Sequence, residues 1–93
     1  MTRRESAETT GLKALGWVMG PAGLSEVFMG ASGLSAESLR RRADDPEVLA
    51  AVLDFVLMDD AWVLGFAAAE GLAPQAVAEA RAALPGGSTP HWT

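Results

Sequence analysis

The sequence predicts an all-α protein, a compact bundle of about five to six short helices, on three observations. Apolar residues recur at helical spacing along most of the 93-residue chain. Prolines and glycines stand where helices would begin and end. No stretch shows the strict apolar–polar alternation of a half-buried strand. We expect residues 1–93 to form one domain, because 49% of them are hydrophobic and can build a dense core.

Capping residues and helix breakers set the bounds of six predicted helices. The predicted ranges are 7 or 9 to 19, 21–32, 36–43, 46–58, 60–70 and 74–84. Ser35, Asp59 and one residue of the pair Asp44-Asp45 can accept hydrogen bonds from the first turns that follow them. Gly33 and Gly71 can adopt the left-handed conformation that ends a helix.

The chain aligns with itself at an offset of 38 residues, which predicts two three-helix units. The matched pairs are Leu15 with Leu53, Trp17 with Phe55, Val18 with Val56, Phe28 with Phe66, Gly33-Leu34 with Gly71-Leu72, and Leu39 with Val77. We expect units over about 9–43 and 45–84, with flexible tails over 1–8 and 86–93. Packed face to face, the units would bury Leu15, Trp17, Leu53, Val56 and Phe66 in one core.

Charge is unevenly distributed along the chain. The net charge is −5, yet residues 1–43 sum to +2 and residues 44–93 to −7. The two halves can therefore attract each other, within one chain or between chains. The acidic half disfavours binding to nucleic acid, which needs clustered Lys and Arg. The absence of Cys excludes disulfides, thiolate metal sites and a Cys nucleophile.

The chain is expected to be cytoplasmic and to have no membrane span. Residues 1–10 are polar and lack the apolar segment of a secretory signal. The longest apolar run, 48–58, is interrupted by Asp54 and is too short to cross a bilayer.

Chemistry-bearing residues are few, so we expect no enzyme activity, no cofactor and no metal. His91 lies in a Pro-containing tail, without the fixed neighbour that a catalytic His needs. Asp59-Asp60 lacks the spacing of a Ca²⁺ loop and is better explained by helix capping. A carboxylate-based enzyme around Asp54 and Asp59 stays open as the least favoured alternative.

The favoured hypothesis is a protein-interaction module whose partner is either another protein or a second copy. Met58 and Trp62 lie one helical turn apart and belong to residue types that are enriched at interfaces. Trp62 could instead be part of the core. Asp54 interrupts an apolar helix and is either solvated, paired with an Arg of the 40–42 run, or a functional carboxylate at a groove. Arg40 and Arg41 complete the candidate partner-binding residues.

A helix-turn-helix-like nucleic-acid-binding protein is the alternative. Ala67, Gly71 and Val77 have the spacing of that motif, namely a small residue, a turn Gly and a buried aliphatic. The second helix of the pair, however, carries only Arg81 as a cation. Two helices joined by a Gly turn explain the same spacing.

The residues at which helices of the second half are expected to begin and end resemble those of a known family. The segment Arg40-Arg-Arg-Ala-Asp-Asp-Pro-Glu-Val-Leu-Ala-Ala-Val-Leu-Asp-Phe-Val-Leu57 is followed by Asp59-Asp60 and by Gly71-Leu-Ala-Pro74. Over roughly residues 12–85 the chain is similar to a family of short alphaproteobacterial proteins known as a domain of unknown function. It departs from that family at Gly20-Pro21, where an acidic pair is expected. The resemblance implies an all-helical fold and carries no catalytic residues.

Overall fold

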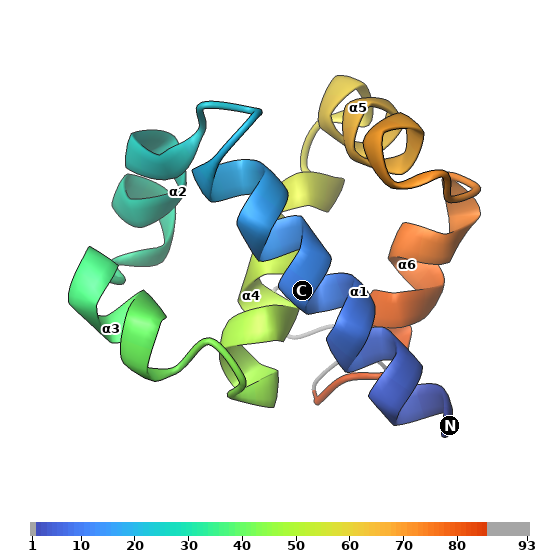
Figure 1. Ribbon diagram of the computed structural model, residues 1–93, viewed down its shortest axis with the longest axis horizontal. Coiled ribbons are helices and arrows are strands. Elements are labelled where there is room, and N and C mark those ends of the chain that lie inside the picture. The colour runs from blue at the N-terminus through green and yellow to red at the C-terminus, as the bar shows by residue number, and fades with distance from the viewer. Residues whose placement is uncertain (1, 86–93) are drawn as a thin grey trace, which may run out of the picture.

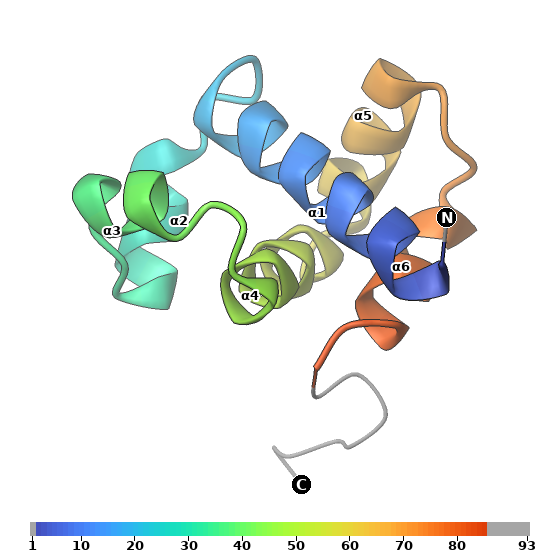
Figure 2. The same cartoon turned by 60° about the horizontal axis from the view of Figure 1, so that its bottom comes forward.

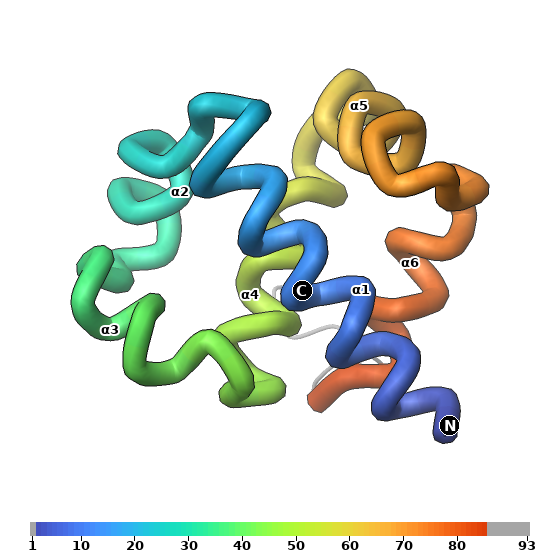
Figure 3. The backbone as a smooth tube through the Cα atoms, viewed as in Figure 1, coloured from blue at the N-terminus to red at the C-terminus, as the bar shows by residue number. Residues whose placement is uncertain are grey.

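The structure, a computed structural model, describes residues 2–85. These residues form six α-helices and no strand. The helices are α1 (Arg3–Met19), α2 (Ser25–Ser32), α3 (Ala36–Arg41), α4 (Pro46–Leu57), α5 (Asp60–Glu70) and α6 (Gln75–Ala82). Short connections join them into a bundle with a radius of gyration of 12.1 Å (Figures 1 and 3). The predicted all-α bundle is therefore confirmed.

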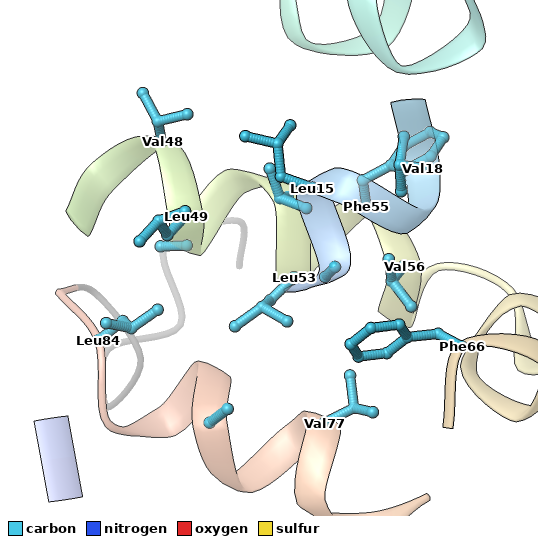
Figure 4. Packing of buried hydrophobic residues seen from close by; sticks show 14 of the residues in the cluster. Leu15, Val18, Val48, Leu49, Leu53, Phe55, Val56, Phe66, Val77 and Leu84 are labelled. Atoms are coloured by element: carbon cyan, nitrogen blue, oxygen red, sulfur yellow. The ribbon is translucent and has the colours of Figure 1, made fainter. Parts of the chain in front are cut away.

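Helix α4 lies at the centre of the bundle, because α1, α2, α5 and α6 all pack against it (Figures 1 and 2). Seven of its 12 residues are buried, more than in any other described helix. Figure 4 shows Phe66 of α5 between Val56 of α4 and Val77 of α6. Among residues 2–85 no polar or charged residue is buried, so the core is held by apolar packing alone.

Helix α1 begins at Arg3, so the predicted start at Ala7 or Thr9 is wrong. The Thr2 hydroxyl accepts from the Glu5 amide at 3.1 Å, and the Thr2 amide donates to Glu5 Oε1 at 2.8 Å. This reciprocal capping box satisfies two amides that would otherwise lack partners at the start of the helix. Residues 3–8, predicted as part of a flexible tail, are consequently helical. The other predicted tail, 86–93 with His91, lies outside the described residues.

The second helix begins at Ser25, four residues later than predicted. Gly23 has a left-handed φ of 66°, which interrupts any helix starting at Pro21. The amides of Ala22 and Leu24 instead donate to the last carbonyls of α1. The third and sixth helices are also shorter than predicted, ending at Arg41 and Ala82.

The remaining caps match their predictions. The Asp59 carboxylate accepts from the Ala61 amide at 2.8 Å, and Ser35 accepts from Ser38 at 3.1 Å. Of the pair Asp44-Asp45, Asp45 caps α4 by accepting from the Glu47 amide. Gly33 and Gly71 end α2 and α5 with φ values of 76° and 67°.

Residues matched by the 38-residue offset share similar environments. Leu15 with Leu53, Val18 with Val56, Phe28 with Phe66 and Leu39 with Val77 are all buried. The third helices of the two units nevertheless differ in placement. Helix α6 packs against both α1 and α4, whereas α3 lies at the edge of the molecule (Figure 1). The duplication therefore stays a prediction. Of the five residues expected in one core, Trp17 is half-buried and the others are buried.

Replacement of Gly11 by Ala tests the crossing of α1 over α4. A Cβ atom at Gly11 would lie 2.9 Å from Leu49 Cβ, which cannot move without shifting α4. We expect Gly11→Ala to lower the free energy of unfolding by about 1–3 kcal/mol. Gly16→Ala on the same helix meets nothing within 4 Å and should raise it by roughly 0.5–1 kcal/mol. Urea denaturation measures both values, and similar effects of the two substitutions would contradict the close crossing.

Acid destabilisation tests the cap of α4. The hydrogen bond from the Glu47 amide, followed by that from the Arg42 guanidinium, holds the pKa of Asp45 below its ordinary value of 3.8. The ionised cap therefore stabilises the fold above the pKa of the unfolded chain, and this stabilisation is lost as the pH falls through the folded pKa. The midpoint of urea denaturation should fall as the pH is lowered into the acidic range. We expect this fall to be less steep in Asp45→Asn than in the wild type. Asp44→Asn is the matched control and should keep the wild-type slope. Equal slopes in both variants would contradict the assignment.

Candidate functional site

Met58 is the most exposed large apolar side chain that the structure describes, at 72%. It occupies a two-residue corner between α4 and α5. Its amide donates back to the carbonyls of Phe55 and Val56, which ends α4, and Asp59 immediately caps α5. Since the chain turns at once, no neighbouring element covers the Met58 side chain. The predicted surface position of Met58 is thus a consequence of the corner.

Met58 also lines a hollow between α2 and α4 with a volume of about 200 Å³. We call it the α2–α4 hollow and define it by Phe28, Ala31, Ser32, Ala51, Asp54, Phe55 and Met58. Ala51, Asp54 and Met58 project from one stripe of α4, because their spacing of three and four residues is that of a helix face. Small residues at positions 31, 32 and 51 leave the space that the hollow occupies.

Phe55 lies under the hollow and joins three helices through aromatic contacts. Its ring packs edge-on against Phe28 of α2, with centroids 5.2 Å apart. On the other side it stacks with Trp62 of α5 at 4.6 Å and an interplanar angle of 26°. Trp62 is half-buried and packs against the core through this stack. Trp62 therefore supports the corner that carries Met58, and it does not line the hollow itself.

Asp54 pairs with Arg81 of α6, which is a partner that the sequence analysis did not consider. Arg81 Nε donates to Asp54 Oδ1 at 2.6 Å, and its Nη1 donates to the Pro85 carbonyl at 2.9 Å. The Arg81 side chain is 11% exposed and that of Asp54 46%. The suggested pairing of Asp54 with the 40–42 run is wrong, because Arg42 of that run bonds Asp45 instead. Asp54 also lines the α2–α4 hollow, and the functional role that one alternative gave to its carboxylate stays a prediction.

Arg40 and Arg41 are exposed on α3 and do not join the other candidate residues. Helix α3 lies at the opposite side of the molecule from α5 in both ribbon views (Figures 1 and 2). Neither Arg forms an ion pair with any residue in 2–85. The structure thus brings together Asp54 and Met58 in the lining of the hollow, with Trp62 packed against Phe55, and includes neither arginine in that lining.

The α2 wall of the hollow was missed by sequence reasoning. Phe28 was assigned to the core, where it is indeed 1% exposed, and Ala31 and Ser32 carried no signal. Arg81 could have been found. It is the sole cation of residues 44–93, so it was the one available partner in that half for a carboxylate within an apolar helix.

The helix pair α5–α6 buries the residues expected of the helix-turn-helix-like spacing. Ala67 and Val77 are 2% and 0% exposed, and Gly71 has the predicted left-handed φ. On α6, however, the only basic side chain is Arg81, which is held by Asp54 and by the Pro85 carbonyl. The described surface of α6 therefore offers little to a phosphate backbone.

Two other hollows are lined by the first turns of α1. One, of about 290 Å³, lies against α6, and the other, of about 330 Å³, includes Ala43, Asp44 and Leu49. In the described part of the chain no three acidic or His side chains converge in a way that could hold a metal ion. None of the helices within residues 2–85 combines the length and hydropathy needed to cross a membrane.

A double-mutant cycle tests the ion pair at the hollow. Because Arg81 is largely buried, we expect Asp54→Asn and Arg81→Met to show a coupling free energy of about 1 kcal/mol in urea denaturation. The exposed pair Arg4–Glu8, joined at 3.3 Å, is the matched control and should couple by less than about 0.5 kcal/mol. A coupling near zero for Asp54 and Arg81 would show that the pair does not hold α6 to α4.

Searches among curated proteins and among solved structures find no match for this chain. A family described as "Protein of unknown function (DUF3572)" matches residues 4–87. This span takes in all six described helices except Arg3, the first residue of α1, and it includes every residue of the α2–α4 hollow. The predicted resemblance to a domain of unknown function is confirmed: the chain belongs to the DUF3572 family.

Proposed function

We propose that this protein is a non-enzymatic interaction module that binds a protein partner at the α2–α4 hollow. The observation that carries the proposal is the 72% exposure of Met58 at the edge of that hollow. Leaving a large apolar side chain in water forgoes the gain from burying it, and such residues beside a concave surface are typical of binding sites.

The contacts on either side of Met58 favour a binding surface that is already ordered before a partner binds. The corner is fixed on one side by the Asp59 cap and on the other by the stack of Trp62 on Phe55. A backbone that is already ordered loses little conformational entropy when a partner binds. Trp62 contributes to this site indirectly, since its replacement would remove the stack on Phe55 and disturb the corner that carries Met58.

Nucleic-acid binding, the alternative, gains no specific support. The surface of α6 carries no unpaired cation among the described residues, and the acidic half of the chain repels phosphates. An enzyme using Asp54 gains none either, since its carboxylate is bonded to Arg81.

Capture of partners from the native cell with three versions of the protein tests the proposal. Met58→Ser removes the anchor, and its high exposure predicts an unfolding midpoint close to that of the wild type. Leu64→Ser is the matched control, because Leu64 is 58% exposed on α5 and does not line the hollow. We expect the wild type and Leu64→Ser to retain the same partner and Met58→Ser to lose at least about 90% of it, equivalent to about 1.4 kcal/mol. Equal capture by all three would contradict the proposal.

A further inference from the structure

We infer that the α2–α4 hollow takes a short basic protein segment, in which one apolar side chain fills the hollow and flanking Lys or Arg residues face the acidic side of the site. This inference rests on the proposed function and adds the chemistry of the partner. It follows from the size of the hollow and from the charges along α4 and the start of α5.

The size of the hollow limits what enters it. A cavity of roughly 150 Å³ holds a benzene molecule, so a volume of about 200 Å³ accepts one aromatic or branched aliphatic side chain. Its walls are suited to such a group. Phe28 and Phe55 provide aromatic surface, while Ala31 and Ala51 allow close approach of a partner backbone. A single anchor indicates a short segment and a small contact, which is typical of weak, transient complexes.

The charges on the α4 side are all of one sign. Glu47 lies on the same stripe of α4 as Asp54 and Met58, and Asp59 and Asp60 follow Met58 directly. Glu47, Asp59 and Asp60 are exposed, and Asp54 is half-exposed.

These carboxylates are not compensated from within their half of the chain. The only cation of residues 44–93, Arg81, is 11% exposed and bonds one Asp54 oxygen. The other Asp54 oxygen accepts no hydrogen bond from residues 2–85. Cationic side chains on a partner would complement these carboxylates, because the exposed charges on the α4 side are all negative.

A second copy of the chain is the less favoured occupant. The exposed cations of such a copy at positions 40 and 41 lie on α3 and are not among the residues that line its own hollow. A copy that docked through α3 in a head-to-tail contact would leave a free hollow at one end of the assembly and a free α3 at the other. A separate basic segment needs no such open chain.

Selection of peptides from a displayed library of random 12-residue sequences tests the inference. The bait is the full chain, and each enriched peptide is then measured on Met58→Ser, Leu64→Ser, Asp60→Asn and Glu70→Gln. We expect enriched peptides to carry an apolar residue flanked by Lys or Arg. Their affinity should fall at least about tenfold on Met58→Ser and stay unchanged on Leu64→Ser. Asp60→Asn should weaken them several-fold, whereas Glu70→Gln, at the far end of α5, should not. Raising the salt to about 0.5 M should reduce the preference for basic peptides.

The outcomes separate the two proposals. Enriched peptides that depend on Met58 but show no excess of Lys or Arg would overturn the inference and leave the proposed function standing. Basic peptides that bind Met58→Ser as well as the wild type would also overturn it, because they would mark attraction to the acidic half in general. A library that yields no peptide dependent on Met58 would count against both. Concentration-dependent self-association that is lost in Met58→Ser would assign the hollow to a second copy.

Discussion

Burial of α4 by four other helices is the constraint on which the rest of the structure depends. A chain of this length can surround only one helix on most of its sides, and α4 is the most apolar candidate. Every buried residue of α4 is Val, Leu, Ala or Phe. Because only four helices surround it, one stripe stays uncovered. That stripe carries Glu47, Ala51, Asp54 and Met58, so the polar and exposed residues of the central helix are gathered where the bundle is open.

The ring of Phe55, on α4, packs against the two helices beside the opening, α2 and α5. Within residues 2–85 it is the one aromatic ring that pairs with rings of both α2 and α5. The contact of Phe28 with Phe55 holds α2 near the open stripe. Helix α2 does not close over the stripe, since its other residues at the hollow, Ala31 and Ser32, are small. Helix α6 is fixed independently by Val77 and by the Arg81–Asp54 pair. The hollow is thus a product of the core, not of a mobile loop.

The fold was predictable from the sequence where helix ends carry their own signals. Asp59, Gly33 and Gly71 set their termini through local hydrogen bonds or backbone conformation, and those helices end or begin as expected. Errors arose where a local signal was overlooked or ambiguous. The Thr2–Glu5 capping box lies in a polar segment that the composition predicts as a tail, and Pro21 predicts a helix start although Gly23 follows it.

The candidate site was predictable only in part, because it depends on contacts between distant segments. Met58 could be placed on the surface from its position between two caps. The second wall of the hollow could not, since helical spacing does not tell which face of α2 meets α4. The pairing of Asp54 with Arg81 spans 27 residues and depends on how α6 packs against α4. Charge alone predicts Arg40 and Arg41 as site residues, and neither lines the hollow in the structure.

Solvent accessibility of individual methyl groups in α4 and at its end tests the central claim most directly. A soluble paramagnetic agent broadens NMR signals of methyl groups that it can reach. The structure predicts strong broadening of the Met58 methyl group, which is 72% exposed, and almost none for Val52 and Val56, which are both 0% exposed. A protected Met58 would show that the open stripe is covered in the free protein. Broadening of Val52 or Val56 comparable to that of Met58 would show that α4 is not the enclosed centre of the bundle.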